Sequence, residues 1–99
     1  MEIDRDGIEI KKIKEFIKLK NKKALEIGCG NGRLSFLLSK EVKKLIAIDS
    51  DKKSIEKAKL KIKNVDFRIC SGEDLPFPDD AFDVVFLYFL FIIKTAKKL

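Results

Sequence analysis

The sequence contains no histidine and no tryptophan, and its only cysteines are Cys29 and Cys70. Zinc and iron sites are built largely from histidine and cysteine at close, characteristic spacings. Because the two cysteines lie far apart and no histidine accompanies them, the sequence predicts no metal site. The same absence leaves no histidine that could activate Cys29 as a nucleophile, so we interpret Cys29 as a small loop residue.

Long apolar segments are absent as well. The longest apolar run, Val84 to Ile93, has ten residues, about half of what a membrane-spanning helix needs, and it predicts a buried segment. The N-terminus shows no signal-peptide pattern, and two isolated cysteines are typical of a reducing compartment. We therefore expect a cytoplasmic protein that is not associated with a membrane.

Charge is abundant. Of the 99 residues, 38% are charged and 45% are hydrophobic, and the formal net charge is +6. This composition predicts one soluble folded domain over residues 1–99. Because the lysines are spread along the chain and mixed with glutamate and aspartate, they favour a solvated surface, and we expect no nucleic-acid partner. The heavy use of Lys, Glu and Ile resembles the composition of thermophile proteins.

Hydrophobic periodicity divides the chain into alternating helices and strands. Helical spacing predicts an amphipathic helix over residues 8–20, a second helix with apolar positions from Leu34 to Val42, and a third that follows Asp49 and continues to about Lys63. Short apolar runs predict buried strands at 24–27, 45–48, 65–70 and from near Phe82 through Leu87. This alternation predicts an α/β fold with a mostly parallel sheet covered on both faces.

A glycine-rich loop, residues 26–32 with the sequence EIGCGNG, lies between the first predicted strand and the helix after it. Glycines allow a sharp turn and a close approach of a ligand to the backbone, and the following helix offers N–H groups without partners inside the helix. Asp49 ends the second predicted strand, and a right-handed crossover places it beside the loop. A carboxylate there can accept hydrogen bonds from both hydroxyl groups of a ribose.

The spacing of the glycines separates two classes of cofactor. Dinucleotide-binding oxidoreductases require glycine or alanine at the last position of G-x-G-x-x-G, where this chain has Arg33. A nicotinamide-dependent oxidoreductase is compatible with the sequence only if Arg33 points away from the loop. Glu26 followed by G-x-G-x-G instead resembles the first motif, E/D-x-G-x-G-x-G, of class I S-adenosylmethionine-dependent methyltransferases.

A second stretch extends this resemblance. Residues 71–85, SGEDLPFPDDAFDVV, are similar to the G-D-A-E-x-L-P-F-P-D-x-S-F-D-x-V of the UbiE-type methyltransferases, and the signatures together span residues 24–87 in the family's order. The resemblance implies a Rossmann-like three-layer α/β/α sandwich, S-adenosylmethionine as co-substrate and methyl transfer to a small-molecule acceptor. No N-P-P-Y sequence, which adenine and glutamine amide methyltransferases place after strand four, occurs here.

The resemblance also implies a set of cofactor-binding residues. The residues of the glycine loop would hold the methionine part of the cofactor, and Leu87 would close over that end. Asp49 would bind the ribose, and residues after the second and third strands would border the adenine. The set is Glu26, Gly28, Cys29 and Gly30 for the methionine part, Asp49 for the ribose, Ser50, Gly72 and Glu73 for the adenine, and in addition Gly32 of the same loop and Leu87.

One departure from the family pattern is visible in the sequence. Ser71 stands where family members often carry an aspartate, so the adenine amino group would meet an uncharged acceptor. No catalytic residue is assigned, because methyl transfer depends mainly on holding and aligning the nucleophile. We interpret Asp79, Asp80 and Asp83 as a surface turn and a strand start rather than as a catalytic cluster.

The resemblance covers only part of the family's domain, which has seven strands in the order 3-2-1-4-5-7-6. We expect a sheet truncated after about four strands, in the order 3-2-1-4, in which Cys29 and Cys70 lie about 10 Å apart and stay reduced. The fourth strand would then be an edge, with the continuation Phe89 to Ile93 uncovered. It would pair with a second copy or a complementary C-terminal half, unless the chain is a truncated product that survives only by association. A non-catalytic S-adenosylmethionine-binding module is the alternative to an active enzyme.

Overall fold

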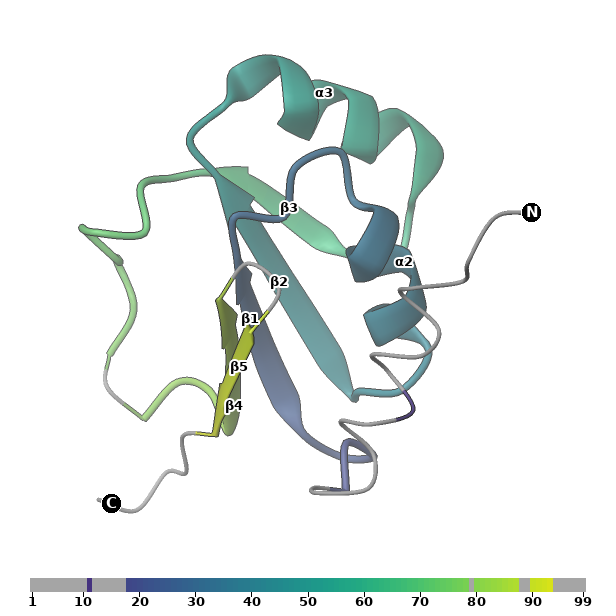
Figure 1. Ribbon diagram of the computed structural model, residues 1–99, viewed down its shortest axis with the longest axis vertical. Coiled ribbons are helices and arrows are strands. Elements are labelled where there is room, and N and C mark those ends of the chain that lie inside the picture. The colour runs from purple at the N-terminus through teal and green to yellow at the C-terminus, as the bar shows by residue number, and fades with distance from the viewer. Residues whose placement is uncertain (1–10, 12–17, 79, 88–89, 94–99) are drawn as a thin grey trace.

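The computed structural model describes residue 11 and residues 18–78, 80–87 and 90–93. Within these residues, five strands form one sheet and two helices pack on it (Figure 1). The elements are β1 (Lys23–Ile27), α2 (Arg33–Ser39), β2 (Lys44–Asp49), α3 (Lys52–Lys61), β3 (Asp66–Ile69), β4 (Val84–Leu87) and β5 (Leu90–Ile93).

The sheet has the strand order β3-β2-β1-β4-β5. The first four strands are parallel, as the pairs β1–β2, β1–β4 and β2–β3 show. The predicted order 3-2-1-4 is therefore confirmed. Parallel pairing also brings the carboxyl ends of β1 and β2 to the same edge of the sheet, because Ile27 lies opposite Ile48.

The prediction that β4 forms an edge was wrong. β5 pairs with β4 in the antiparallel direction, with Leu87 opposite Leu90 and Val84 opposite Ile93. The end of the apolar run therefore forms β5, which lies beside β4. The backbone of β4 is paired on both sides, with β1 and with β5. Within the described residues, the outer strands of the sheet are β3 and β5.

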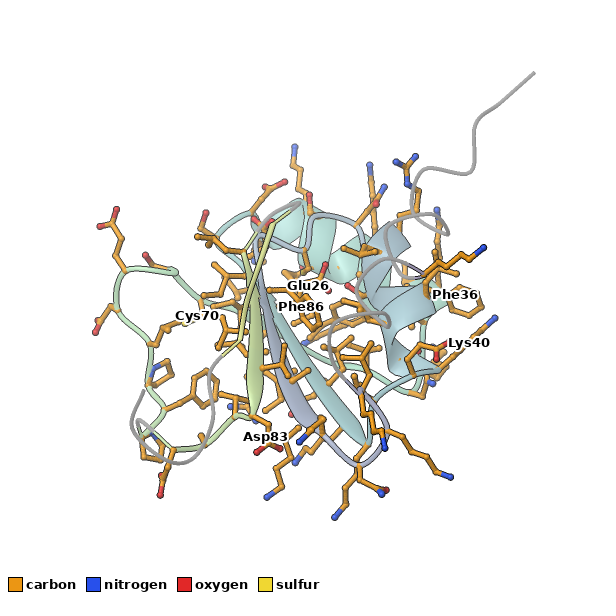
Figure 2. All side chains as sticks on the ribbon, turned by 60° about the horizontal axis from the view of Figure 1, so that its bottom comes forward. Glu26, Phe36, Lys40, Cys70, Asp83 and Phe86 are labelled. Carbon is orange, nitrogen blue, oxygen red and sulfur yellow. The ribbon has the colours of Figure 1, made fainter. Side chains whose placement is uncertain are left out.

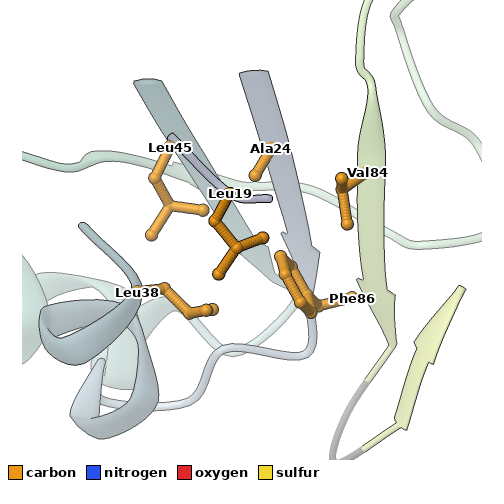
Figure 3. Packing of buried hydrophobic residues seen from close by; sticks show 6 residues of the cluster. All are labelled: Leu19, Ala24, Leu38, Leu45, Val84 and Phe86. Carbon is orange, nitrogen blue, oxygen red and sulfur yellow. The ribbon is translucent and has the colours of Figure 1, made fainter. Parts of the chain in front are cut away.

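One face of the sheet is covered by both described helices. Leu38 of α2 packs among buried side chains of β1, β2 and β4 (Figure 3), and Ile55 and Ala58 of α3 pack against Ala47 and Phe67. Complete burial of a side chain such as Phe86, 1% exposed, contributes about 1.5–3 kcal/mol to stability. The cluster around Leu38 consists of Leu19, Ala24, Leu38, Leu45, Val84 and Phe86.

The opposite face is covered by the segment between β3 and β4, which contains turns but neither helix nor strand at its described positions. Phe82 is 7% exposed and packs with Leu25, Ile27 and neighbouring strand residues. Phe77 meets the Phe82 ring edge-to-face, with 5.0 Å between the ring centroids. In Figure 1 this segment lies on the side of the sheet away from α2 and α3.

The helices are shorter than periodicity predicted. α2 ends at Ser39, before Val42, and α3 ends at Lys61. Most of the helix predicted over 8–20 lies outside the described residues, but its predicted last residues are not helical: Lys18 and Leu19 have no regular structure, and a turn follows in which Asn21 has φ of 70°. No helix among the described residues is both long and apolar enough to span a membrane.

Candidate functional site: the carboxyl edge of the sheet

The glycine loop starts where β1 ends and is held by the neighbouring strand. The backbone N–H groups of Gly28 and Cys29 both donate to the carbonyl oxygen of Ile48, at 2.9 and 3.0 Å. The loop then closes on itself, because Gly32 N–H donates to the Cys29 carbonyl at 3.1 Å. β1 and β2 together therefore fix the shape of the loop.

The three loop glycines adopt left-handed backbone conformations, with φ of 80° at Gly28, 58° at Gly30 and 92° at Gly32. Their surroundings differ. A Cβ at Gly32 would lie 2.8 Å from Ile62 Cδ1 and 3.0 Å from Phe67 Cζ, whereas a Cβ at Gly30 would meet nothing within 4 Å. Gly32 is thus closely packed against side chains at the end of α3 and in β3, whereas open space lies beside Gly30.

Asp49 joins the loop to the start of α3. Its Oδ2 accepts a hydrogen bond from Gly30 N–H, and its Oδ1 accepts one from Asp51 N–H, both at 2.8 Å. Each carboxylate oxygen has a second lone pair, so both can accept a further hydrogen bond. The position predicted from the βαβ pattern is confirmed: the Asp49 carboxylate lies against the glycine loop.

Glu26 is buried, with 2% of its surface exposed. The hydroxyl of Ser35, on the first turns of α2, donates to Glu26 Oε1 at 2.5 Å. Across the sheet, Glu26 lies opposite Ala47 of β2 and Phe86 of β4, and Figure 2 labels Glu26 and Phe86 in the interior. Ser35, which is fully buried, was not singled out from the sequence, because a serine in a helix carries no distinctive local pattern.

The Cys29 thiol is held in its protonated form. Burial, followed by the negative charges of Glu26 and Asp49, raises the pKa of Cys29 to about 12. A thiol with such a pKa is a poor nucleophile at neutral pH. Cys29 and Cys70 are both free cysteines.

The residues assigned to the adenine side lie at the same edge. A Cβ at Gly72 would stand 2.7 Å from Ile27 Cγ2, so the backbone at Gly72 passes directly over the end of β1. Ser71 Oγ accepts a hydrogen bond from Glu73 N–H at 3.1 Å and shapes this turn. Leu87 lies opposite Ile27 in the β1–β4 pairing. Ser50 and Glu73 are exposed.

The acidic residues near β4 are separate from this edge. Asp83 precedes β4 at the opposite end of the sheet, where its Oδ2 accepts a hydrogen bond from Lys23 N–H at 2.9 Å. Asp80 is exposed, and Asp79 lies outside the described residues. Nowhere in the described part of the chain do three or more His, Cys, Asp or Glu residues gather in a way that could hold a metal ion.

The family can be decided by comparison with known proteins. The profile of the family described as "Methyltransferase domain" matches residues 24–99. The chain belongs to this methyltransferase family. Its match to a solved S-adenosylmethionine-dependent methyltransferase of Aquifex aeolicus has a TM-score of 0.69 and 31% sequence identity, and it covers 80% of this chain and 46% of that one. The methyltransferase fold is therefore present in part, and S-adenosylmethionine is the co-substrate of the family.

Curated relatives of this methyltransferase chain differ in what their names say they methylate. It is 42% identical over 65 residues to the ribosomal RNA small subunit methyltransferase A of Mycoplasmopsis synoviae, a match over 66% of this chain and 25% of that protein. It is 39% identical over 71 residues to the ubiquinone biosynthesis O-methyltransferase of Pelagibacter ubique, over 68% of this chain and 29% of that protein. The chain thus spans about a quarter of the length of these relatives.

Proposed function

We propose that the carboxyl edge of the sheet binds S-adenosylmethionine and that the protein is an S-adenosylmethionine-dependent methyltransferase. The observation that carries this proposal is the contact of Gly30 N–H with Asp49 Oδ2 at 2.8 Å. It holds the Asp49 carboxylate, which we propose as the acceptor for ribose hydroxyls, beside a loop with open space at Gly30. Membership of the methyltransferase family supports the same ligand.

The geometry suggests how the cofactor would divide over the site. Asp49 would bind the ribose through the lone pairs that Gly30 N–H and Asp51 N–H leave open. The loop backbone at Gly28, Cys29, Gly30 and Gly32, together with buried Glu26, would hold the methionine part. Ser50, Gly72 and Glu73 would border the adenine, and Leu87 would lie at the methionine end.

We further propose a small molecule as the methyl acceptor. Two observations support this choice: the similarity of residues 71–85 to the UbiE-type signature, and Leu87-Tyr88-Phe89-Leu90 at the place where adenine methyltransferases carry N-P-P-Y. In the reaction the acceptor's electron pair forms a bond to the methyl carbon while the bond from that carbon to sulfur breaks. The electron pair of the broken bond stays on sulfur, which yields S-adenosylhomocysteine. An acceptor whose attacking atom carries a hydrogen releases it as a proton to water.

Calorimetric titration tests the cofactor site. S-adenosylmethionine and S-adenosylhomocysteine should bind to the purified chain with micromolar affinity, and NADH should not bind. Asp49→Ala should weaken both by about tenfold or more, because hydrogen bonds to a charged acceptor contribute about 1.5–3 kcal/mol each. Asp80→Ala removes one exposed carboxylate and serves as the matched control.

Circular dichroism of the Asp49→Ala variant distinguishes lost contacts from a lost fold, because Asp49 also holds two backbone N–H groups. If Asp49→Asn and Asp49→Ala keep both the native spectrum and the affinity of the original protein, the ribose assignment is incorrect. Binding of NADH in preference to S-adenosylmethionine would replace the proposed ligand by a dinucleotide.

A non-catalytic S-adenosylmethionine-binding module is the second candidate. It is favoured by the polar groups described at this edge, Asp49 and the Glu26–Ser35 pair, because the roles proposed for them all concern the cofactor. Incubation with S-adenosylmethionine labelled at the methyl group and with cell metabolites separates the two candidates. An enzyme transfers label to an acceptor, whereas a module binds the labelled cofactor and transfers none.

A further inference from the structure

The opposite edge of the sheet, where the parallel strands begin, collects lysines that are dispersed in the sequence. Lys22 and Lys23 stand at the start of β1, and Lys43 and Lys44 stand at the start of β2. Lys23 lies directly opposite Lys44 in the sheet, and the N–H of Lys43 donates to the Lys22 carbonyl at 2.9 Å. Lys63 lies on the approach to β3. Parallel strands that are neighbours in a sheet begin at the same edge. The topology therefore brings together lysines that lie far apart in the sequence.

Three of these lysines, Lys43, Lys44 and Lys63, line a hollow of about 360 Å³. Residues from the starts of β2 and β3 line it: Lys43, Lys44, Leu45, Lys63, Asn64, Val65 and Asp66. Figure 2 turns this edge toward the viewer and shows side chains that end in nitrogen around the labelled Asp83. The strand starts of neighbouring strands are about 4.8 Å apart, so three strand starts spread the charges over about 10 Å.

The acidic groups at this edge already have partners. Asp66 forms an ion pair with Arg68, at 2.9 Å from Arg68 Nη2 to Asp66 Oδ2. Asp83 Oδ2 accepts a hydrogen bond from the backbone N–H of Lys23. Among the described residues, no ion pair joins the Lys43, Lys44 or Lys63 ammonium group to an acidic side chain. Lys63 Nζ donates to the Lys59 carbonyl at 3.3 Å, and the charge of Lys44 helps to lower the pKa of Asp66, after the larger effect of the hydrogen bonds from Arg68. A positive potential therefore remains in and around the hollow.

We propose that this amino edge binds single-stranded nucleic acid through its phosphodiester backbone. Ammonium groups are compact donors to phosphate oxygens. The Asn64 amide, whose Nδ2 donates to Ser39 Oγ at 3.2 Å, adds a second N–H and a neutral acceptor. A row of lysines along a concave edge suits a narrow, flexible chain of phosphates. A flat anionic membrane would need lysines beside an apolar face that enters the bilayer, and exposed lysines and Asn64 occupy the rim here instead. The surface is separate from the glycine loop, so the proposal is independent of the cofactor site.

Fluorescence anisotropy with labelled 12-nucleotide RNA and DNA oligonucleotides tests the proposal. The test variant is the triple substitution Lys43→Ser, Lys44→Ser and Lys63→Ser. The matched control carries Lys52→Ser, Lys53→Ser and Lys57→Ser, which remove the same charge from exposed positions on α3. Circular dichroism should give the native spectrum for both variants before their affinities are compared.

The unaltered chain should bind both oligonucleotides, and its affinity should fall steeply with salt. Loss of three phosphate contacts should weaken binding at least tenfold at low salt and reduce the slope of log affinity against log salt by about 2, because single strands give about 0.7 per contact. The control variant should stay within about threefold of the original protein. RNA and DNA should bind similarly, since the backbone phosphates carry the contact.

Three results would overturn the proposal. Equal losses in the two variants would show diffuse attraction to a cationic protein rather than a site. Absence of oligonucleotide binding at low salt would show that the hollow does not accept phosphodiesters. Binding of the chain to phosphatidylserine vesicles, abolished by the hollow substitutions while oligonucleotide binding persists, would assign the surface to membranes.

Discussion

The two ends of the parallel strands are built in different ways. At the carboxyl edge, the shape of the loop is determined mainly by its backbone: by glycines in left-handed conformations and by N–H groups that donate to the Ile48 carbonyl. The Asp49 carboxylate adds one side-chain contact to this backbone. At the amino edge, exposed lysine side chains line a hollow and form no ion pair with an acidic side chain among the described residues. The first edge should therefore be sensitive to single substitutions, whereas the second should respond gradually to the number of charges removed.

The largest effect is expected at Gly32. Gly32→Ala would place a Cβ 2.8 Å from Ile62 Cδ1 at a φ of 92°, so strain adds to overpacking. The free energy of unfolding should fall by about 2–5 kcal/mol, as measured by urea denaturation. Gly30→Ala, with φ of 58° and open space, should lose only about 1–2 kcal/mol.

The pair Gly32→Ala and Ile62→Val sharpens this comparison if the single variant does not fold. Ile62→Val deletes the Cδ1 atom that the new Cβ would meet, so the double variant should recover part of the loss. Equal losses for Gly32→Ala and Gly30→Ala would mean that the packing beneath the loop yields freely.

An intermediate effect is expected at Ser35. Ser35→Ala removes the hydroxyl that donates to the buried Glu26 carboxyl group, and an unsatisfied buried polar group costs about 1–3 kcal/mol of unfolding free energy. Ser39→Ala, on the same helix, removes a hydroxyl that donates to the Phe36 carbonyl and accepts from Asn64 Nδ2 near the surface. It should cost about 0.5 kcal/mol or less, because water can replace both partners. Thermal unfolding of the two variants decides the point, and similar melting temperatures would contradict it.

The smallest effect is expected at the amino edge. The pKa of Asp66 is lowered mainly by hydrogen bonds from Arg68. Because both side chains are well exposed, Asp66→Asn should lower the free energy of unfolding by less than about 1 kcal/mol at neutral pH. Because the folded-state pKa is lowered, this stabilisation is present above the ordinary pKa of aspartate and disappears as the pH falls through the folded-state pKa. Urea unfolding at neutral and strongly acidic pH should show the difference between wild type and variant vanish in acid.

Much of the carboxyl edge was predictable because its signals are local. The apolar run before Gly28, the glycines and Asp49 at the end of β2 lie within one βαβ unit, whose handedness fixes their meeting. The packing reason for Gly32 was not predictable, because Ala58, Ile62 and Phe67 contact it from distant parts of the sequence. The partnership of Glu26 with Ser35 likewise depends on how α2 docks on the sheet.

The pairing of β5 with β4 was missed because the connecting Tyr88 and Phe89 carry no Asn-Gly or Asp-Gly signal of a tight hairpin. An unbroken apolar run predicts burial without revealing that it contains two strands. The gathering of lysines at the amino edge was missed for a related reason. Periodicity describes the charges on one element at a time. The parallel sheet, in contrast, places the starts of three strands side by side and so brings their lysines together.

The two hydrogen bonds that Asp49 accepts from Gly30 N–H and Asp51 N–H have a consequence for the thermodynamics of ligand capture. The rim of the loop loses its conformational entropy when the chain folds, rather than when a ligand arrives. Preorganisation of this kind reduces the ordering cost that association otherwise carries. A nucleoside that enters would share Asp49 with the backbone instead of displacing it, so the empty and occupied loops should have nearly the same shape.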